Sequence, residues 1–224
     1  MVHGNHEGFA HLASIAPRKT PDDPVIPGDL PRVDSGRHIQ LLPSGWRTVL
    51  SSGYIIGAVG GIEPGQREAA YHPMAYIDPD AVLRLAGAKL DVLITHQGPA
   101  AVQGAKGSTT LDFLLNPPVA AVWFHGHSTE QTGPLRAGTS DGCQVVPLGD
   151  IAFAADPRAD DLPGRDGWAL LRFEERVATV RKKPPSFLRE FRRRRWMAVD
   201  DERLVAPPLA RLSPECSRST FRKT

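Results

Sequence analysis

The stretch Asp91-Val92-Leu93-Ile94-Thr95-His96 indicates the fold class of this 224-residue chain. Its apolar run is short and uninterrupted, which is typical of a strand buried on both faces of a parallel sheet. The run ends on His96. We therefore expect a central strand that places a histidine at its carboxyl end.

The segments on either side of this strand follow the same pattern. Asp78-Pro79 predicts the start of a helix, with aspartate as N-cap and proline at the first helical position. Ser108 predicts a second helix, which Asn116-Pro117-Pro118 would end. Residues 119–124 form another apolar run, followed by His125-Gly126-His127. Strand, helix, strand, helix, strand is the order of an α/β layered core.

Outside this core, turn residues separate shorter predicted elements. Residues 16–37 are rich in proline, aspartate and glycine and predict a long surface loop. Strands are expected at 38–42, at 47–51 paired with 54–59 as a hairpin, at 144–148, and at 168–173 paired with 176–180. The last three of these ranges are expected to be antiparallel strands that close the fold. A final helix is expected to begin near Ser186 and to end at Arg192–Arg195.

Composition and charge bound the class of protein. Hydrophobic residues make up 41% and charged residues 23%, which fits a globular chain, and no apolar run approaches the ~20 residues of a membrane span. Cys143 and Cys216 are the only cysteines, so a reducing cytoplasm is the expected location. Residues 181–224 have a net charge of +8 and the remainder −6. We expect a domain over 1–180 and a basic, partly helical or disordered tail over 181–224.

Three predicted strands end in polar residues that can ligate a metal. They are Asn5-His6, His96, and the pair His125 and His127. Ligands of open α/β sheets bind beyond the carboxyl ends of the strands, so these side chains are expected to converge. Imidazole and amide oxygen suit Zn, Mn, Fe or Ni. Any single histidine is more often a cap, core or surface residue, but three at strand ends favour a site.

The remaining histidines do not follow this pattern. His3, His11, His38 and His72 are interpreted as surface or loop residues, although His3 adjoins the first motif and could line a pocket.

Three motifs give the chain a family resemblance. Gly4-Asn5-His6-Glu7, Leu93-Ile94-Thr95-His96-Gln97-Gly98-Pro99 and Phe124-His125-Gly126-His127 resemble, in order and strand context, the last three motifs of calcineurin-like metallophosphoesterases. The resemblance covers residues 2 to about 150. It implies a layered β-sandwich flanked by helices, with two divalent metal ions held between the sheets. The layout also resembles, weakly, the RNA-lariat debranching branch of that superfamily.

The resemblance also implies roles for individual residues. Asn5, with Gly4 beside it, would ligate the second metal and help to hold the phosphate of the substrate. His6, oriented by Glu7, would protonate the leaving group as general acid. His96 and His127 would ligate the second metal, and a hydroxide between the metals would attack phosphorus in line.

The sequence departs from the family at its amino terminus. The earlier D-x-H and G-D-x-x-D motifs, which supply the first metal and the bridging aspartate, do not precede Gly4, and the first β-α-β elements are missing with them. A wrongly assigned start codon or a degenerate fragment would each explain this. We expect a weak single metal site at most, and slow or absent hydrolysis.

The last motif, normally G-H-x-H, allows two registers. If it starts at Gly126-His127, Thr129 replaces its final histidine; if it is His125-x-His127, Phe124 replaces its glycine. The first register is favoured because it keeps a glycine where the backbone comes close at the strand end. His127 is a ligand in both registers, whereas His125 is one only in the second.

The sequence therefore predicts a metal-dependent phosphoesterase, acting on a phosphomonoester or phosphodiester and impaired in this chain. An inactive fragment is one alternative. A nucleic-acid-binding module is another, in which Arg192, Arg193, Arg194 and Arg195 contact phosphates. A solvated helix face is the favoured interpretation of those arginines. No membrane partner is expected, and the specific substrate is left open.

Overall fold

The computed structural model describes most of the first 127 residues and separate strands beyond them. The described residues are 1–5, 7–17, 19–65, 72–127, 135–136, 142–148, 168–174, 177–183, 198–200 and 203–204. The predicted helix at 186–195, with its four arginines, lies outside them.

A six-stranded sheet forms the centre of the molecule, with the strand order β1-β2-β3-β4-β6-β5. Its strands are β1 (Arg47–Val49), β2 (Ile55–Val59), β3 (Leu90–Thr95), β4 (Ala120–His125), β5 (Leu135–Arg136) and β6 (Gln144–Pro147). β2, β3, β4 and β6 are parallel, while β1 and β5 run antiparallel to their neighbours at the two edges.

The predicted strands around the opening stretch are confirmed. β3 and β4 lie side by side, with Thr95 opposite His125, and β1 and β2 form the expected hairpin, with Thr48 opposite Ile56. One expectation is wrong: β6 is parallel to β4 and belongs to the central sheet. Its continuous apolar run, Val145-Val146-Pro147, fits either direction, because both faces of this sheet are covered.

The helices are short, and most of them connect consecutive strands along the chain. They are α1 (Phe9–Ile15), α2 (Pro79–Ala86) and α3 (Ala100–Gln103), with 3-10 helices η1 (Pro27–Asp29), η2 (Pro73–Ala75), η3 (Gly104–Lys106) and η4 (Leu111–Leu114). α2 begins as predicted, because the Asp78 side chain accepts a hydrogen bond from Asp80 N and Pro79 follows it.

The second predicted helix is replaced by a shorter element. Between Ser108 and Asn116 only the single 3-10 turn η4 forms, and the hydroxyl of Ser108 accepts from Leu111 N without starting an α-helix. Pro117, only three residues after η4, leaves too little chain for further helical turns.

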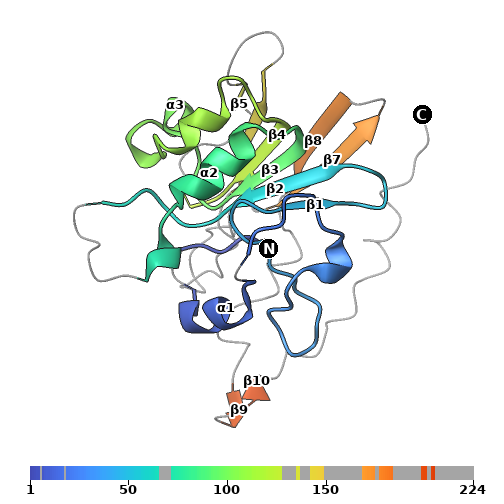
Figure 1. The fold of residues 1–224 in the computed structure, drawn as a ribbon, viewed down its shortest axis with the longest axis vertical. Coiled ribbons are helices and arrows are strands. Elements are labelled where there is room, and N and C mark those ends of the chain that lie inside the picture. Colours follow the sequence, from blue (N-terminus) through green and yellow to red (C-terminus); the bar gives the residue numbers. More distant parts are fainter. Residues whose placement is uncertain are drawn as a thin grey trace, which may run out of the picture.

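Apolar side chains cover both faces of the sheet, and most of the elements that contribute them are labelled in Figure 1. On one face, Leu93 and Trp123 pack with Leu85 of α2 and Leu114 of η4. On the other face, a two-stranded sheet of β7 (Trp168–Glu174) and β8 (Val177–Lys183) contributes Leu171, Phe173 and Val180 to a cluster with Val92, Val122 and Val146. Tyr54 stacks on Phe173 with ring centroids 4.3 Å apart. The result is a layered α/β arrangement.

The segment before β1 lacks the strand that was expected at residues 38–42. Residues 38–42 do not form a strand; Gln40 makes a single bridge with Arg32. The segment is instead held by a third apolar cluster, in which Leu30, Leu42 and Trp46 pack against Ala58 of β2. A further pair of short strands, β9 (Ala198–Asp200) and β10 (Arg203–Leu204), lies near the carboxyl end.

Among the described helices, none is both long and apolar enough to cross a bilayer.

Candidate metal site at the carboxyl edge of the sheet

The fold brings three of the predicted ligands to one edge of the parallel strands. His96 follows β3 directly, and its N–H donates to Val59 O at the end of β2. The amino-terminal segment joins the same edge, because Gly61 N donates to His3 O, two residues before Asn5. His127 follows β4 by two residues. These residues lie up to 122 positions apart in the chain. The parallel pairing of β3 and β4 unites His96 with His127, and the contact between Gly61 and His3 adds Asn5.

Nε2 of His96 lies at the centre of this group. It is 3.0 Å from Oδ1 of Asn5 and 3.1 Å from Nδ1 of His127. The two imidazole rings are tilted by 57°, with centroids 4.8 Å apart. Asn5 and His96 are half-buried and His127 is exposed, so the group is open to solvent on one side.

These distances are compatible with a shared cation. A ring nitrogen has a single in-plane hydrogen or lone pair, so one hydrogen bond cannot serve both close neighbours of His96 Nε2 fully. Donors bound tetrahedrally at 2.0–2.2 Å lie about 3.4 Å from one another. The His96 nitrogen would therefore need to separate from its neighbours on Asn5 and His127 by only a few tenths of an ångström around a divalent ion.

The donor set contains no carboxylate. Within the described part of the chain, no group of three or more histidine, cysteine, aspartate or glutamate side chains could hold a metal ion. The three converging residues consist of two histidines and an amide, which is a neutral set. Such a set compensates little of a dication's charge, so its affinity is expected to be lower than that of a carboxylate-containing site.

His127 adopts an uncommon backbone conformation. Its φ is +63°, in the left-handed region where non-glycine residues are few, although histidine is enriched among them. Such conformations cluster at functional sites. In this conformation the His127 ring lies beside His96, with its Nδ1 3.1 Å from Nε2 of His96.

Gly4 lets the first motif pass close to His96. A Cβ at Gly4 would lie 2.9 Å from Cε1 of His96, so a side chain there would displace the His96 ring. Gly4 N donates to Oε1 of Glu7 at 3.2 Å, so the Glu7 carboxylate holds the backbone of this turn. His6, the predicted general acid, lies outside the described residues, and so does the relation of Glu7 to its ring.

His125 is separated from this group by the direction of its side chain. It is 1% exposed, and Gly98 lies so close that a Cβ there would be 2.8 Å from Cε1 of His125. Gly126, in contrast, has space: a Cβ would lie 3.6 Å from His96 O, an ordinary contact. The close approach that favoured one register of the last motif is therefore not required at Gly126. Thr129 lies outside the described residues.

His3 differs from its expected surface position. It is 3% exposed, and its ring lies where a Cβ on Gly60 would be, 2.3 Å from Cε1. Desolvation lowers the pKa of His3, with a hydrogen bond to the Met74 backbone and the charge of Glu7 acting in the opposite direction. His3 also lines a cavity of about 280 Å³ together with Leu41, Pro43, Ser44, Pro73, Met74, Tyr76 and Asp78.

Cys143 does not have the properties of a metal ligand. The thiol is buried at the start of β6, and desolvation raises its pKa to about 12. It therefore stays protonated at neutral pH and does not resemble a thiolate ligand.

Sequence reasoning missed the polar contacts behind His96. Gln97 is buried, and its side chain joins Glu63 N to Lys106 O. Glu63 in turn accepts from hydroxyl groups of residues 108–110. Glu63 lies in a loop beyond Gly60-Gly61 and no motif distinguishes it, so the sequence contained no signal for this contact.

Comparisons with known proteins leave the family open. No protein-family profile and no curated protein sequence matches the chain. Among solved structures, the crystal structure of TT1561 of Thermus thermophilus is similar over 63% of this chain and 58% of its own, with 16% identity and a TM-score of 0.39. The chain thus spans less than two thirds of that structure, and a likeness of this size supports no conclusion about family or activity.

Proposed function

We propose that this chain binds one divalent metal ion through Asn5, His96 and His127 and hydrolyses phosphate esters slowly with it. The observation that supports the proposal is the convergence of Asn5 Oδ1 and His127 Nδ1 on Nε2 of His96, within 3.1 Å. The three residues belong to the three motifs that resemble calcineurin-like metallophosphoesterases. Zn, Mn, Fe and Ni all suit this ligand set.

Each residue of the group has a separate task in this proposal. His96 and His127 supply neutral nitrogen ligands, and Asn5 supplies its amide oxygen, which leaves the Asn5 NH₂ group to donate to a phosphate oxygen. Gly4 provides the space that lets Asn5 reach His96. His6 is proposed to protonate the leaving oxygen, with Glu7 stabilising the turn that contains it.

A bound divalent ion would polarise the phosphoryl group and lower the pKa of water near it. With a neutral ligand set and one ion, both effects are expected to be smaller than in a dinuclear centre that contains carboxylates. The proposed activity is consequently low, and whether the substrate is a monoester or a diester is left to experiment.

The test combines metal binding with hydrolysis of a model substrate. Zn²⁺ and Mn²⁺ are titrated into the full chain by calorimetry, and release of p-nitrophenol from bis(p-nitrophenyl) phosphate and from p-nitrophenyl phosphate is followed with and without chelator. We expect one metal per chain and slow turnover that both chelator and Asn5→Ala abolish. Absence of metal binding would refute the site, and hydrolysis that survives chelator would refute the mechanism.

Two predictions from the sequence compete with this proposal. An inactive fragment, which binds one metal or none, predicts no turnover in the same assay. A nucleic-acid-binding module predicts binding that weakens steeply with salt and disappears when residues 181–224 are deleted. Arg192–Arg195 lie outside the described residues, so the second alternative is based on the sequence alone.

A further inference from the structure

The turn that positions His96 is closed by contacts from a distant loop. Gln97, the next residue, accepts from Glu63 N through Oε1 at 2.6 Å and donates from Nε2 to Lys106 O at 2.7 Å. The Thr95 hydroxyl donates to Gln97 O and accepts from Nε1 of Trp123 at 2.8 Å. The residues on both sides of His96 are therefore buried and hydrogen-bonded.

The Glu63 carboxylate fixes the far end of this connection. It accepts from the hydroxyl groups of Ser108, Thr109 and Thr110, the last at 3.0 Å, and from Thr110 N at 3.3 Å. Hydrogen bonds to an ionised acceptor are stronger than neutral ones, so four donors on one carboxylate hold it firmly.

The same donors belong to the loop that returns to His96. Ser108 is fully buried, its N–H donates to Gly98 O at 2.9 Å, and its carbonyl accepts from Ala100 N at 3.0 Å. Gly98 N donates to Oε1 of Gln103 at 3.0 Å. Residues 97–108 thus form a closed loop, and Glu63 binds both of its ends, at Gln97 through its N–H and at 108–110 through its carboxylate.

We infer that Glu63 is a positioning residue, which holds the turn containing His96 so that Nε2 stays beside Asn5 and His127. The role of the metal in this inference depends on the proposed function; the position of the His96 ring does not. Within the described part of the chain, the partners of the Glu63 carboxylate are hydroxyl and amide donors rather than a cation. The carboxylate is therefore placed to organise this loop.

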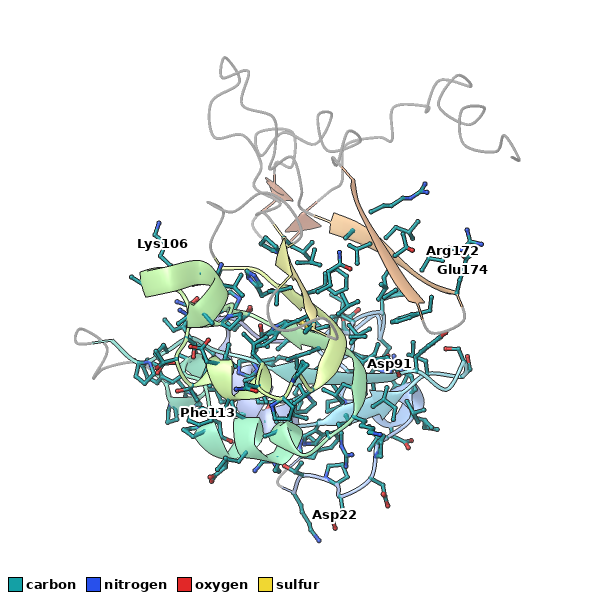
Figure 2. The ribbon with its side chains drawn as sticks, turned by 90° about the horizontal axis from the view of Figure 1, so that it is seen from above. Asp22, Asp91, Lys106, Phe113, Arg172 and Glu174 are labelled. Atoms are coloured by element: carbon teal, nitrogen blue, oxygen red, sulfur yellow. The ribbon has the colours of Figure 1, made fainter. Side chains whose placement is uncertain are left out.

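The test compares Glu63→Ala and Glu63→Gln with Glu174→Ala. Glu174 is a suitable control because it is an exposed carboxylate on β7, paired with Arg172 at 2.6 Å, on the opposite side of the view in Figure 2 from Lys106. The first measurement is the Hε1–Cε1 NMR signal of His96 in the metal-free full chain. Glu63→Ala is expected to shift and broaden this signal, and Glu174→Ala to leave it unchanged.

The second measurement is the Zn²⁺ dissociation constant, determined well below the melting temperature of each variant. Substituting a residue that orients a metal ligand typically changes the metal affinity 10–100-fold. Glu63 contacts Gln97 rather than His96 itself, so we expect Zn²⁺ binding to be about tenfold weaker in Glu63→Ala. Glu63→Gln keeps one acceptor oxygen and should lie between Glu63→Ala and the wild type.

The outcomes separate this inference from the proposed function. A lower melting temperature with an unchanged His96 signal would refute positioning and leave Glu63 as a stabilising residue only. If the wild-type chain binds no Zn²⁺, the proposed function fails, and the His96 signal still decides the role of Glu63. In a Glu63→Ala/Gln97→Ala double variant, the two losses of affinity should be less than additive, because both act through the same turn.

Discussion

The ends of β3 and β4 present histidines in two different ways. Thr95 and His125 face each other in the parallel register, so His125 occupies a position equivalent to that of a buried threonine. His96, one residue further along β3, leaves the strand and lies 3.0 Å from Asn5. A difference of one residue in register thus separates a core histidine from a candidate ligand, as expected where side chains alternate between faces.

The turns that follow the two strands are also stabilised differently. Behind His96, buried side chains of Thr95 and Gln97 hold the backbone through hydrogen bonds. After β4, backbone contacts hold the chain: Gly126 N donates to His96 O at 2.9 Å, and the left-handed conformation of His127 follows. The first turn is fixed by side chains and the second by backbone geometry, so substitutions at the two should have distinct effects.

The largest expected effect follows from removing the central ligand. His96→Ala should weaken Zn²⁺ binding more than about a hundredfold, beyond the range for partners outside the ligand shell, because both remaining donors lose the atom they share. That factor corresponds to about 2.7 kcal/mol. Calorimetric titration measures it. His38→Ala is the matched control, since the His38 side chain is 85% exposed and distant in sequence from every proposed ligand.

A smaller effect, on stability rather than affinity, is expected at the buried histidine. His125→Ala removes a ring that is 1% exposed and should lower the free energy of unfolding by about 2 kcal/mol, in the lower range for large-to-small core changes. Urea unfolding of the metal-free chain measures this loss. Zn²⁺ affinity well below the transition should stay within about threefold of the wild type. A loss of affinity as large as that of His96→Ala would instead assign His125 to the metal.

The fold was predictable where the apolar pattern has one solution. The runs at β3 and β4 are too short for helices and are bounded by turn residues, so their assignment as buried parallel strands was correct. The predicted antiparallel direction of β6 was wrong. The sequence of an apolar strand that is covered on both faces does not indicate which neighbouring strand it pairs with. The helix expected after Ser108 became a 3-10 turn, because the proline residues shortly after it leave no room to extend.

The candidate site was predictable in part from the expected strand ends. Asn5, His96 and His127 were identified from those ends together with the family resemblance, and the structure brings them together. The strand expected before Asn5 is wrong, since the described residues 1–5 form none. The predicted surface position of His3 was wrong. Nothing in the sequence around His3 indicates that Gly60, 57 residues away, leaves a space for its ring. Glu63 was missed for a related reason: its partners at 108–110 become neighbours only through tertiary contacts.

The smallest expected effect concerns the backbone at His127. His127→Gly and His127→Ala both remove the ring and should weaken Zn²⁺ binding similarly, but only glycine relieves the left-handed conformation at φ +63°. The strain of about 1–2 kcal/mol is partly offset by ~0.4–1 kcal/mol from the greater entropy of the unfolded glycine chain. The glycine variant should therefore be more stable than the alanine variant by about 1 kcal/mol in urea unfolding. Equal stabilities would mean that His127 does not hold this conformation in solution, and the turn after β4 would then not fix its ring beside His96.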